Sequence, residues 1–387
     1  MGAMRGALSL RSKLPGTGVS IFAVMSRLAA EQGAVNLGQG APDFDCDPAL
    51  VDAVARYMRE GHNQYAPMAG VPRLRAALSR KYETVYGHRY DPDTEITITC
   101  GATEGLYAAL TALVHPGDEV IVFLPAYDAY VPVVELCGGV PVFVPLAAPG
   151  YRIDWDAVRQ AVSPRTRVVL INSPHNPTGM VIDDRDVREL ARVLDTCDAV
   201  AVADEVYEHI IFDGGRHVSL ASDPEVAERA VVVSSFGKTY HTTGWKVGYC
   251  VAPRPLSEEI QKVHQFVTFT INGALQLAYA DAVERDPACS DLAAFYQAKR
   301  DRFLELVAPT RFRARPCAGT YFQLLDYSQI TDEADEAFAL RLLRERGVAS
   351  IPLSPFTYGH DPGPVLRFCF AKQDETLVRA AERLAGV

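Results

Sequence analysis

The sequence predicts an α/β fold, with a large domain built on a mostly parallel β-sheet flanked by helices and a smaller α+β domain. Over most of the 387 residues, short apolar runs alternate with amphipathic segments. Wholly apolar runs are typical of parallel strands that helices cover on both faces. After roughly residue 290 the pattern changes to longer helical segments with two strands. A chain of this length holds two domains of ordinary size.

Six apolar runs are the predicted strands of the large sheet: residues 96–99, 120–124, 168–172, 200–203, 231–234 and 247–251. Amphipathic helical segments accompany them. One helix is predicted to start where Asp47 precedes Pro48 and to end at Gly61. Four apolar residues of that segment share one helical face: Leu50, Val51, Val54 and Met58.

The C-terminal part predicts the smaller domain. Two strands, at residues 321–325 and 365–370, are separated by a helix at residues 337–346. We expect residues 1–45 to form an N-terminal arm and part of the small domain. Residues 46–290 then form the large, cofactor-binding domain, and residues 291–387 form the C-terminal small domain.

Composition and charge exclude several classes of function. A net charge of −10 disfavours nucleic acid or an anionic membrane as the main partner. No apolar run approaches the roughly 18 residues that a membrane helix needs. The eight cysteines include no Cys-x-x-Cys pair, so no metal site or redox motif is expected. Residues 1–8 lack the apolar core of a signal peptide, and a reducing cytoplasm is the expected location.

Lys238 is the most informative single residue. It follows the apolar run 230–233 and lies among small, hydroxylic and aromatic residues, with His241 and Lys246 close by in sequence. Desolvation and neighbouring cations lower the pKa of a lysine, and a neutral amine forms a Schiff base with an aldehyde. An ordinary lysine at a strand-to-loop junction is the alternative.

Three further motifs lie at the ends of predicted strands, where open α/β sheets place their ligands. The loop at residues 101–105 precedes a helix, so it either holds a phosphate or is a plain turn and helix cap. The run at residues 172–179 is rich in turn formers and carries Asn176. Asp204 ends an apolar strand, where a carboxylate needs a buried cation or caps the next helix.

These motifs, in this order, resemble those of a known family over nearly the whole chain. They are Asn176-Pro-Thr-Gly179, Asp204-x-x-Tyr207, and Ser235-x-x-Lys238 followed eight residues later by Lys246. The chain resembles pyridoxal 5′-phosphate enzymes of fold type I, in the class I and II aminotransferases. The resemblance implies a large domain with a mostly parallel, seven-stranded sheet.

The resemblance also implies residue roles. Lys238 forms the Schiff base with the cofactor and later carries a proton, and Asp204 pairs with the pyridine nitrogen. Asn176 and Tyr207 donate to the ring oxygen. The residues implied for the phosphate are Ala102, Thr103, Ser235 and Lys246. Many family members have arginine in place of Lys246, and lysine offers a point charge without the bidentate fork, but we expect phosphate binding to survive.

Two tyrosines receive roles in the same way. Tyr127, after the predicted strand 120–124, resembles the aromatic residue that stacks on the cofactor ring, and a core tyrosine is the alternative. Tyr65 resembles the tyrosine that reaches the phosphate of the neighbouring subunit. The expected partner is therefore a second copy of the chain, in a homodimer with shared active sites.

Arg367 is a charged residue in the apolar run 365–370, where an isolated arginine is costly to bury. A structural ion pair is one explanation. The resemblance gives another, a bidentate clamp on the α-carboxylate of the substrate. Residues 36–44 resemble the loop that covers the substrate, and Gly40 there would offer a backbone N–H to the same carboxylate.

Within the family, the runs 63–68, 204–209 and 234–249 are similar to those of bacterial methionine aminotransferases and of kynurenine and glutamine transaminases. This indicates an apolar or aromatic amino donor, methionine above all, a 2-oxo acid acceptor and ping-pong kinetics. Phe22, Tyr65 and Tyr127 are expected to line the pocket for the donor side chain.

Two other functions remain open at this point. One is a carbon–sulfur lyase, of the kind that cleaves cysteine conjugates, with the same cofactor. The other is a cofactor-binding regulatory module, which is disfavoured because the about 40 residues before the cofactor-binding core lack a basic helix-turn-helix signal.

Overall fold

A computed structural model describes residues 10–387, and the predicted large sheet is present in it with seven strands. The spatial order is β2-β8-β7-β6-β5-β3-β4. The strand bounds are β2 Ile96–Thr99, β3 Glu119–Leu124, β4 Val140–Pro145, β5 Thr166–Asn172, β6 Val200–Asp204, β7 Ala230–Ser235 and β8 Gly248–Val251. All neighbours pair in parallel except β8, which is antiparallel to both β2 and β7. The predicted mostly parallel sheet is therefore confirmed.

Two features of this sheet were not predicted. The seventh strand, β4, was missed because Pro141 and Pro145 interrupt its apolar pattern. Proline is tolerated there because β4 is an edge strand with one neighbour. The reversed direction of β8 is invisible to an apolar pattern, which is the same whichever way a buried strand runs.

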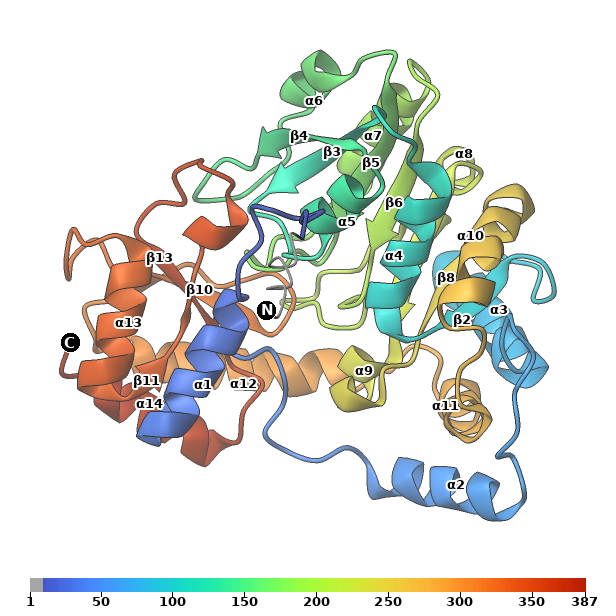
Figure 1. Cartoon of the computed structure of the whole chain (residues 1–387). Coiled ribbons are helices and arrows are strands. Elements are labelled where there is room, and N and C mark those ends of the chain that lie inside the picture. The colour runs from blue at the N-terminus through green and yellow to red at the C-terminus, as the bar shows by residue number, and fades with distance from the viewer. Residues whose placement is uncertain (1–9) are drawn as a thin grey trace, which may run out of the picture.

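Helices cover both faces of the large sheet (Figure 1). In β5, Val168 and Leu170 pack with one layer of helices, and Val169 and Ile171 pack with the other, as the period of two in a strand requires. The first layer consists of α4 Gly101–Leu113, α5 Tyr130–Leu136 and α10 Arg254–Val267. The second layer consists of α3 Pro72–Tyr86, α6 Trp155–Ala161, α7 Asp184–Leu194, α8 Pro224–Ala227 and α11 Gly273–Arg285, and α2 Pro48–Arg59 packs against α11. Side chains along the strands are therefore covered by one helical layer or the other, and only those at a strand end can face a cavity.

Helix α2 begins as predicted, because the Asp47 carboxylate accepts a hydrogen bond from the N–H of Ala49 at 2.9 Å. Leu50 is buried, but Val51 and Met58 keep 46% and 41% of their surface exposed. The predicted shared face is therefore buried in this chain only on one side. The face of α2 that carries Val51 and Met58 is open to solvent.

A smaller antiparallel sheet, in the order β12-β13-β10-β9, lies beside the large one. Its strands are β9 Arg313–Ala314, β10 Phe322–Asp326, β12 Ile351–Pro352 and β13 Val365–Cys369. A two-stranded parallel sheet pairs β1 Val35–Asn36 with β11 Val348–Ala349. Four helices contribute to the core here: α1 Ile21–Gln32, α12 Leu292–Val307, α13 Asp335–Arg346 and α14 Asp374–Leu384.

The predicted elements of the smaller domain correspond to α13, β10 and β13. Met25 and Val35, from the N-terminal part, are buried in the same cluster as Phe338 of α13. This packing agrees with an arm that joins the C-terminal part. The domain limits at residues 45 and 290 stay predictions, and residues 1–8, on which the absence of a signal peptide was argued, lie outside the described residues.

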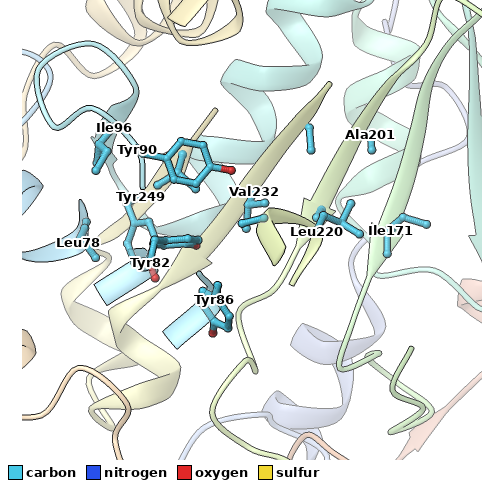
Figure 2. Close-up of a cluster of buried hydrophobic side chains, with 14 of the residues drawn as sticks. Leu78, Tyr82, Tyr86, Tyr90, Ile96, Ile171, Ala201, Leu220, Val232 and Tyr249 are labelled. Carbon is cyan, nitrogen blue, oxygen red and sulfur yellow. The ribbon is translucent and has the colours of Figure 1, made fainter. Parts of the chain in front are cut away.

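A buried polar cluster lies behind the site-bearing strand ends. Lys81 of α3 donates to Glu208 at 2.8 Å, and Glu208 also accepts from Ser234 at 2.6 Å and from Tyr249 at 2.9 Å. Burial opposes charge on Lys81, but the Glu208 carboxylate outweighs it and raises the pKa of Lys81. Figure 2 shows the tyrosines of this region together: Tyr82, Tyr86, Tyr90 and Tyr249. The cluster fixes α3, β7 and β8 against the chain that follows β6.

Candidate active site

A cavity of about 250 Å³ lies between the carboxyl ends of the central parallel strands and the small sheet. It gathers all but one of the predicted site residues, namely Phe22, Gly40, Ala102, Thr103, Tyr127, Asn176, Asp204, Tyr207, Ser235, Lys238, Lys246 and Arg367. A larger hollow of about 510 Å³, bordered by residues 148–152 and 313–318, contains none of them. The chemistry of the side chains, rather than cavity size, therefore locates the site.

Lys238 lies on the short helix α9, Phe236–Thr239, which follows β7 directly. Its Nζ donates to the hydroxyl of Tyr321 at 3.1 Å and to the carbonyl of Gly40 at 3.4 Å. Burial lowers the pKa of Lys238 from 10.5 to about 8. At pH 7 about a tenth of the amine is then neutral, far more than the ordinary pKa would allow, and the neutral form is the one that a nucleophilic amine requires.

Lys246 and His241, the two cations expected beside Lys238, differ in their position relative to the cavity. Lys246 lines the cavity. His241 packs its ring edge-on against Phe44, and burial lowers the pKa of His241 to about 4, so it is neutral at neutral pH. The expectation that His241 helps as a cation is therefore wrong, because its ring is neutral and His241 is not among the residues that line the cavity.

Asp204 ends β6 and is buried. Its carboxylate accepts from the hydroxyl of Tyr130 at 2.6 Å and from the N–H of Val206 at 3.3 Å. Both partners are neutral, and burial raises the pKa of Asp204 from 3.8 to about 6. A cation placed in the cavity would lower that pKa again, and a protonated pyridine nitrogen is such a cation.

The N-terminus of α4 forms the anion-binding end of the cavity. Its first turn contains Ala102 and Thr103, and the side chain of the N-cap residue, Cys100, makes no capping hydrogen bond to the free N–H groups. Lys246 donates to the Thr103 hydroxyl at 3.3 Å. A Cβ at Gly248 would lie 2.7 Å from the backbone N of Ala102, so β8 needs glycine to pass this loop. Together with the hydroxyl of Ser235, this donor set fits a phosphate.

The middle of the cavity contains the groups predicted to face a ring. The Asn176 Oδ1 accepts from Arg367 at 2.7 Å, which leaves the amide NH₂ of Asn176 as a donor. Tyr207 is buried, with its ring edge-on to Tyr321 at 5.1 Å between centroids. Tyr127 lines the same space, and burial raises the pKa of Tyr127 to about 12.

Arg367 lies on β13 and is only 2% exposed. It donates to Asn176 and, at 2.9 Å, to the carbonyl of Gly38, while its Nε has no partner among residues 10–387. Its guanidinium lies 3.9 Å from the ring centre of Phe322 and 4.9 Å from that of Phe22. Both hydrogen-bond partners are neutral oxygens, so the structural ion pair considered above is not what holds Arg367. Among the described residues, therefore, no carboxylate binds the Arg367 guanidinium directly.

Gly40 and Tyr65 need separate comment. A Cβ at Gly40 would lie 2.7 Å from the ring of Phe322, so glycine lets the loop approach the small sheet. The Gly40 carbonyl, rather than its N–H, makes the recorded contacts. Tyr65 is 84% exposed and lies outside the cavity of its own chain. Its role toward a neighbouring chain stays a prediction.

Sequence reasoning missed three aromatic side chains. Tyr130 binds Asp204, Phe322 stacks on Arg367, and Tyr321 contacts Lys238. Tyr130 begins α5 three residues after Tyr127, so its spacing was a usable signal. The other two begin the predicted strand 321–325, but that prediction did not say which of them faces the cavity.

The sequence model of one family, "Aminotransferase class I and II", matches residues 32–384. The chain belongs to this family. It is therefore an aminotransferase that uses pyridoxal 5′-phosphate, and the predicted family, fold class and cofactor are confirmed. The carboxylate of Asp204, the α4 terminus and the half-buried amine of Lys238 fit the pyridine, phosphate and aldehyde groups of that cofactor.

Several proteins are similar to this chain over nearly its full length. The methionine aminotransferase of Escherichia coli is 48% identical over 375 residues, 97% of each chain. A solved structure of an Escherichia coli protein with that function has a TM-score of 0.96 and covers 98% of this chain and 100% of its own. A probable N-succinyldiaminopimelate aminotransferase of Mycobacterium tuberculosis is 38% identical, over 97% of each chain. Human kynurenine–oxoglutarate transaminase 3 is 31% identical, over 96% of this chain and 88% of its own.

Proposed function

We propose that this aminotransferase moves the α-amino group of methionine, or of a similar apolar or aromatic amino acid, to a 2-oxo acid. The strongest support is the 48% identity, over 97% of both chains, with the methionine aminotransferase of Escherichia coli. The cavity agrees, since Phe22, Leu106 and Phe322 make much of its wall apolar. Arg367 is the cation suited to the α-carboxylate, and Lys246 lies at the phosphate end, so neither is free for a carboxylate in the donor side chain.

Different side chains of the site bind the cofactor, bind the substrate and carry the proton. Ala102, Thr103, Ser235 and Lys246 hold the phosphate, and Asn176, Asp204 and Tyr207 hold the ring. When bound, pyridoxal phosphate supplies the carbonyl that receives the amino group and a ring that takes up electrons. Arg367 binds the substrate carboxylate and so orients Cα. Lys238, whose amine is partly neutral, takes the proton from Cα and later returns it. The oxo-acid product leaves before the acceptor enters, which gives ping-pong kinetics.

The first prediction concerns the amino donor. With purified enzyme saturated with cofactor, kcat/KM for methionine should exceed that for aspartate by at least about 100-fold, because the aspartate side chain would bury a charge without a partner. Oxo-acid formation is the measurement, with ammonia and thiol release followed in parallel. Equal rates with aspartate would refute the proposed donor. Release of thiol and ammonia together with an oxo acid that has lost the sulfur would assign a carbon–sulfur lyase, because amino transfer keeps the sulfur in the oxo-acid product and releases no ammonia.

We also propose that the chain forms a homodimer with shared active sites. Tyr65 and Phe266 are each 84% exposed, and Tyr65 lies against Phe269, itself 45% exposed, at 5.4 Å between ring centres. Exposed aromatic clusters of this kind mark protein interfaces on soluble proteins. Val51 and Met58 of α2 add further exposed apolar surface. A second copy of the chain would cover both exposed surfaces. It would also bring Tyr65, which lies outside the cavity of its own chain, to the cavity of the partner chain.

The second prediction tests this dimer. Light scattering of the purified protein should give twice the mass of one chain. Replacing Tyr65 with phenylalanine should keep that mass but weaken cofactor binding by about tenfold, the value of one charge-assisted hydrogen bond of roughly 1.4 kcal/mol. Replacing both Phe266 and Phe269 with glutamate should lower the mass and the activity together. A fully active single chain would contradict shared sites.

A cytoplasmic location is proposed as well. None of the helices in the described part of the chain is both long and apolar enough to cross a membrane. All eight cysteines are free thiols, and several are buried. Thiols persist in a reducing compartment, which supports the cytoplasm.

A further inference from the structure

Tyr321 is a buried tyrosine that touches the reactive amine. It directly precedes β10 and is fully buried. Its hydroxyl donates to the carbonyl of Gly40 at 2.7 Å and accepts from the Nζ of Lys238 at 3.1 Å. One hydroxyl thus joins the lysine to the loop that carries Gly40.

The Lys238 amine is the donor in this contact. A phenol has one proton to donate, and here the Gly40 carbonyl receives it, so only oxygen lone pairs are left to face Lys238. Burial raises the pKa of Tyr321 well above its ordinary range, so the group stays a neutral phenol. Tyr321 is fully buried, and a hydrogen bond made in such surroundings is stronger than one made in water. Tyr321 is therefore a permanent acceptor directed at the amine.

Such an acceptor has a use while Lys238 moves the proton. An N–H of the amine that points at Tyr321 leaves the nitrogen lone pair free to point elsewhere, toward Cα of the substrate. Once the amine has taken up the proton, the ammonium has three N–H groups, and the oxygens of Tyr321 and Gly40 accept two of them. The proton travels from Cα to Nζ and back to carbon, and the phenol neither gains nor loses one.

We propose that Tyr321 is a catalytic residue of the amino transfer, whose hydroxyl holds the Lys238 amine in the orientation for proton transfer. The inference rests on the proposed role of Lys238 as proton carrier, and it does not depend on which amino acid is the donor. It predicts an effect on the proton-transfer step and little effect on substrate binding.

The chain offers a matched control in Tyr296. This tyrosine is also fully buried, with its ring 5.6 Å from that of Tyr321. Its hydroxyl has no hydrogen-bond partner among the described residues. Tyr296→Phe removes the same atom from the same part of the core as Tyr321→Phe, but it breaks no contact with Lys238.

The test compares Tyr321→Phe, Tyr296→Phe and wild type as holoenzymes, with the best amino donor and its Cα-deuterated form. We expect Tyr321→Phe to lower kcat by about 10- to 100-fold, to change KM by less than about threefold, and to raise the deuterium isotope effect on kcat. Tyr296→Phe should stay within about twofold of wild type in all three quantities. Thermal unfolding reports whether each variant is folded.

Other outcomes would overturn the proposal. Retention of kcat in Tyr321→Phe would do so, as would an equal loss in Tyr296→Phe or an isotope effect no larger than that of wild type. A raised KM with unchanged kcat would mean that Tyr321 only positions the Gly40 loop. Failure of the methionine proposal is read separately, from the donor preference of wild type in the same assay.

Discussion

Replacing Lys238 with alanine is expected to abolish amino transfer, with kcat reduced by at least about 10⁴-fold. No other described amine lies in its position, since Lys246 contacts Thr103 at the phosphate end of the cavity. The variant should fold, because alanine is tolerated in the short helix α9 and removes a half-buried amine that is costly to desolvate. The measurements are oxo-acid formation at saturating cofactor and thermal unfolding.

Lys246 supplies the control for this experiment, because both lysines line one cavity. Lys246→Ala removes a cation from the phosphate site but leaves the proton carrier in place. We expect it to weaken cofactor affinity by about 10- to 100-fold, in line with one charged hydrogen bond, while kcat at saturating cofactor stays within about tenfold. Activity above about 1% in Lys238→Ala, or a greater loss of kcat in Lys246→Ala, would reverse the roles assigned to the two lysines.

Much of the fold was predictable because its central strands are buried on both faces. Residues 168–172 and 200–203 are apolar throughout, so their patterns predict strands. β4 was missed because an edge strand tolerates proline, and the direction of β8 was missed because a strand pattern contains no direction. The exposed side of α2 was not predictable for another reason. Val51 and Met58 are apolar, and the sequence does not tell whether apolar residues pack within one chain or against a second one.

The site was predictable where a charged residue lies in an apolar strand, since burial of a charge is costly unless the charge binds a partner. Asp204 and Arg367 are such residues, and the structure gives both of them neutral partners. The roles of Tyr130 and Tyr321 in the site were missed because an aromatic residue beside a strand ordinarily belongs to the hydrophobic core. Their importance lies in the direction of a hydroxyl, which depends on segments far apart in sequence: Tyr321 meets Gly40 across 281 positions. His241 shows the opposite error, since closeness in sequence to Lys238 did not bring its charge into the cavity.

Replacing Arg367 with glutamine should cost the enzyme its hold on the substrate carboxylate. Loss of one partner of a buried charge pair is worth about 2–5 kcal/mol, which is about 30- to 4000-fold in kcat/KM for the amino donor. Glutamine keeps a donor for Gly38 but has neither the charge nor the two parallel N–H groups. The loss should be confined to substrates with a carboxylate. The informative measurement is therefore the ratio of kcat/KM for methionine to that for its decarboxylated amine, which should fall toward one in the variant.

Arg300 supplies the control for this measurement of the kcat/KM ratio. It is also buried, at 3% exposure, and it binds the Asp213 carboxylate through two hydrogen bonds of 2.6 and 2.7 Å. Arg300→Gln therefore removes a buried guanidinium whose carboxylate partner is already part of the chain. It should lower the thermal stability and leave the preference for methionine over the amine unchanged, because nothing in the cavity contacts it. If Arg367→Gln lowers kcat/KM equally for methionine and for the amine, as a destabilised fold would, then Arg367 supports the structure and the carboxylate is bound elsewhere.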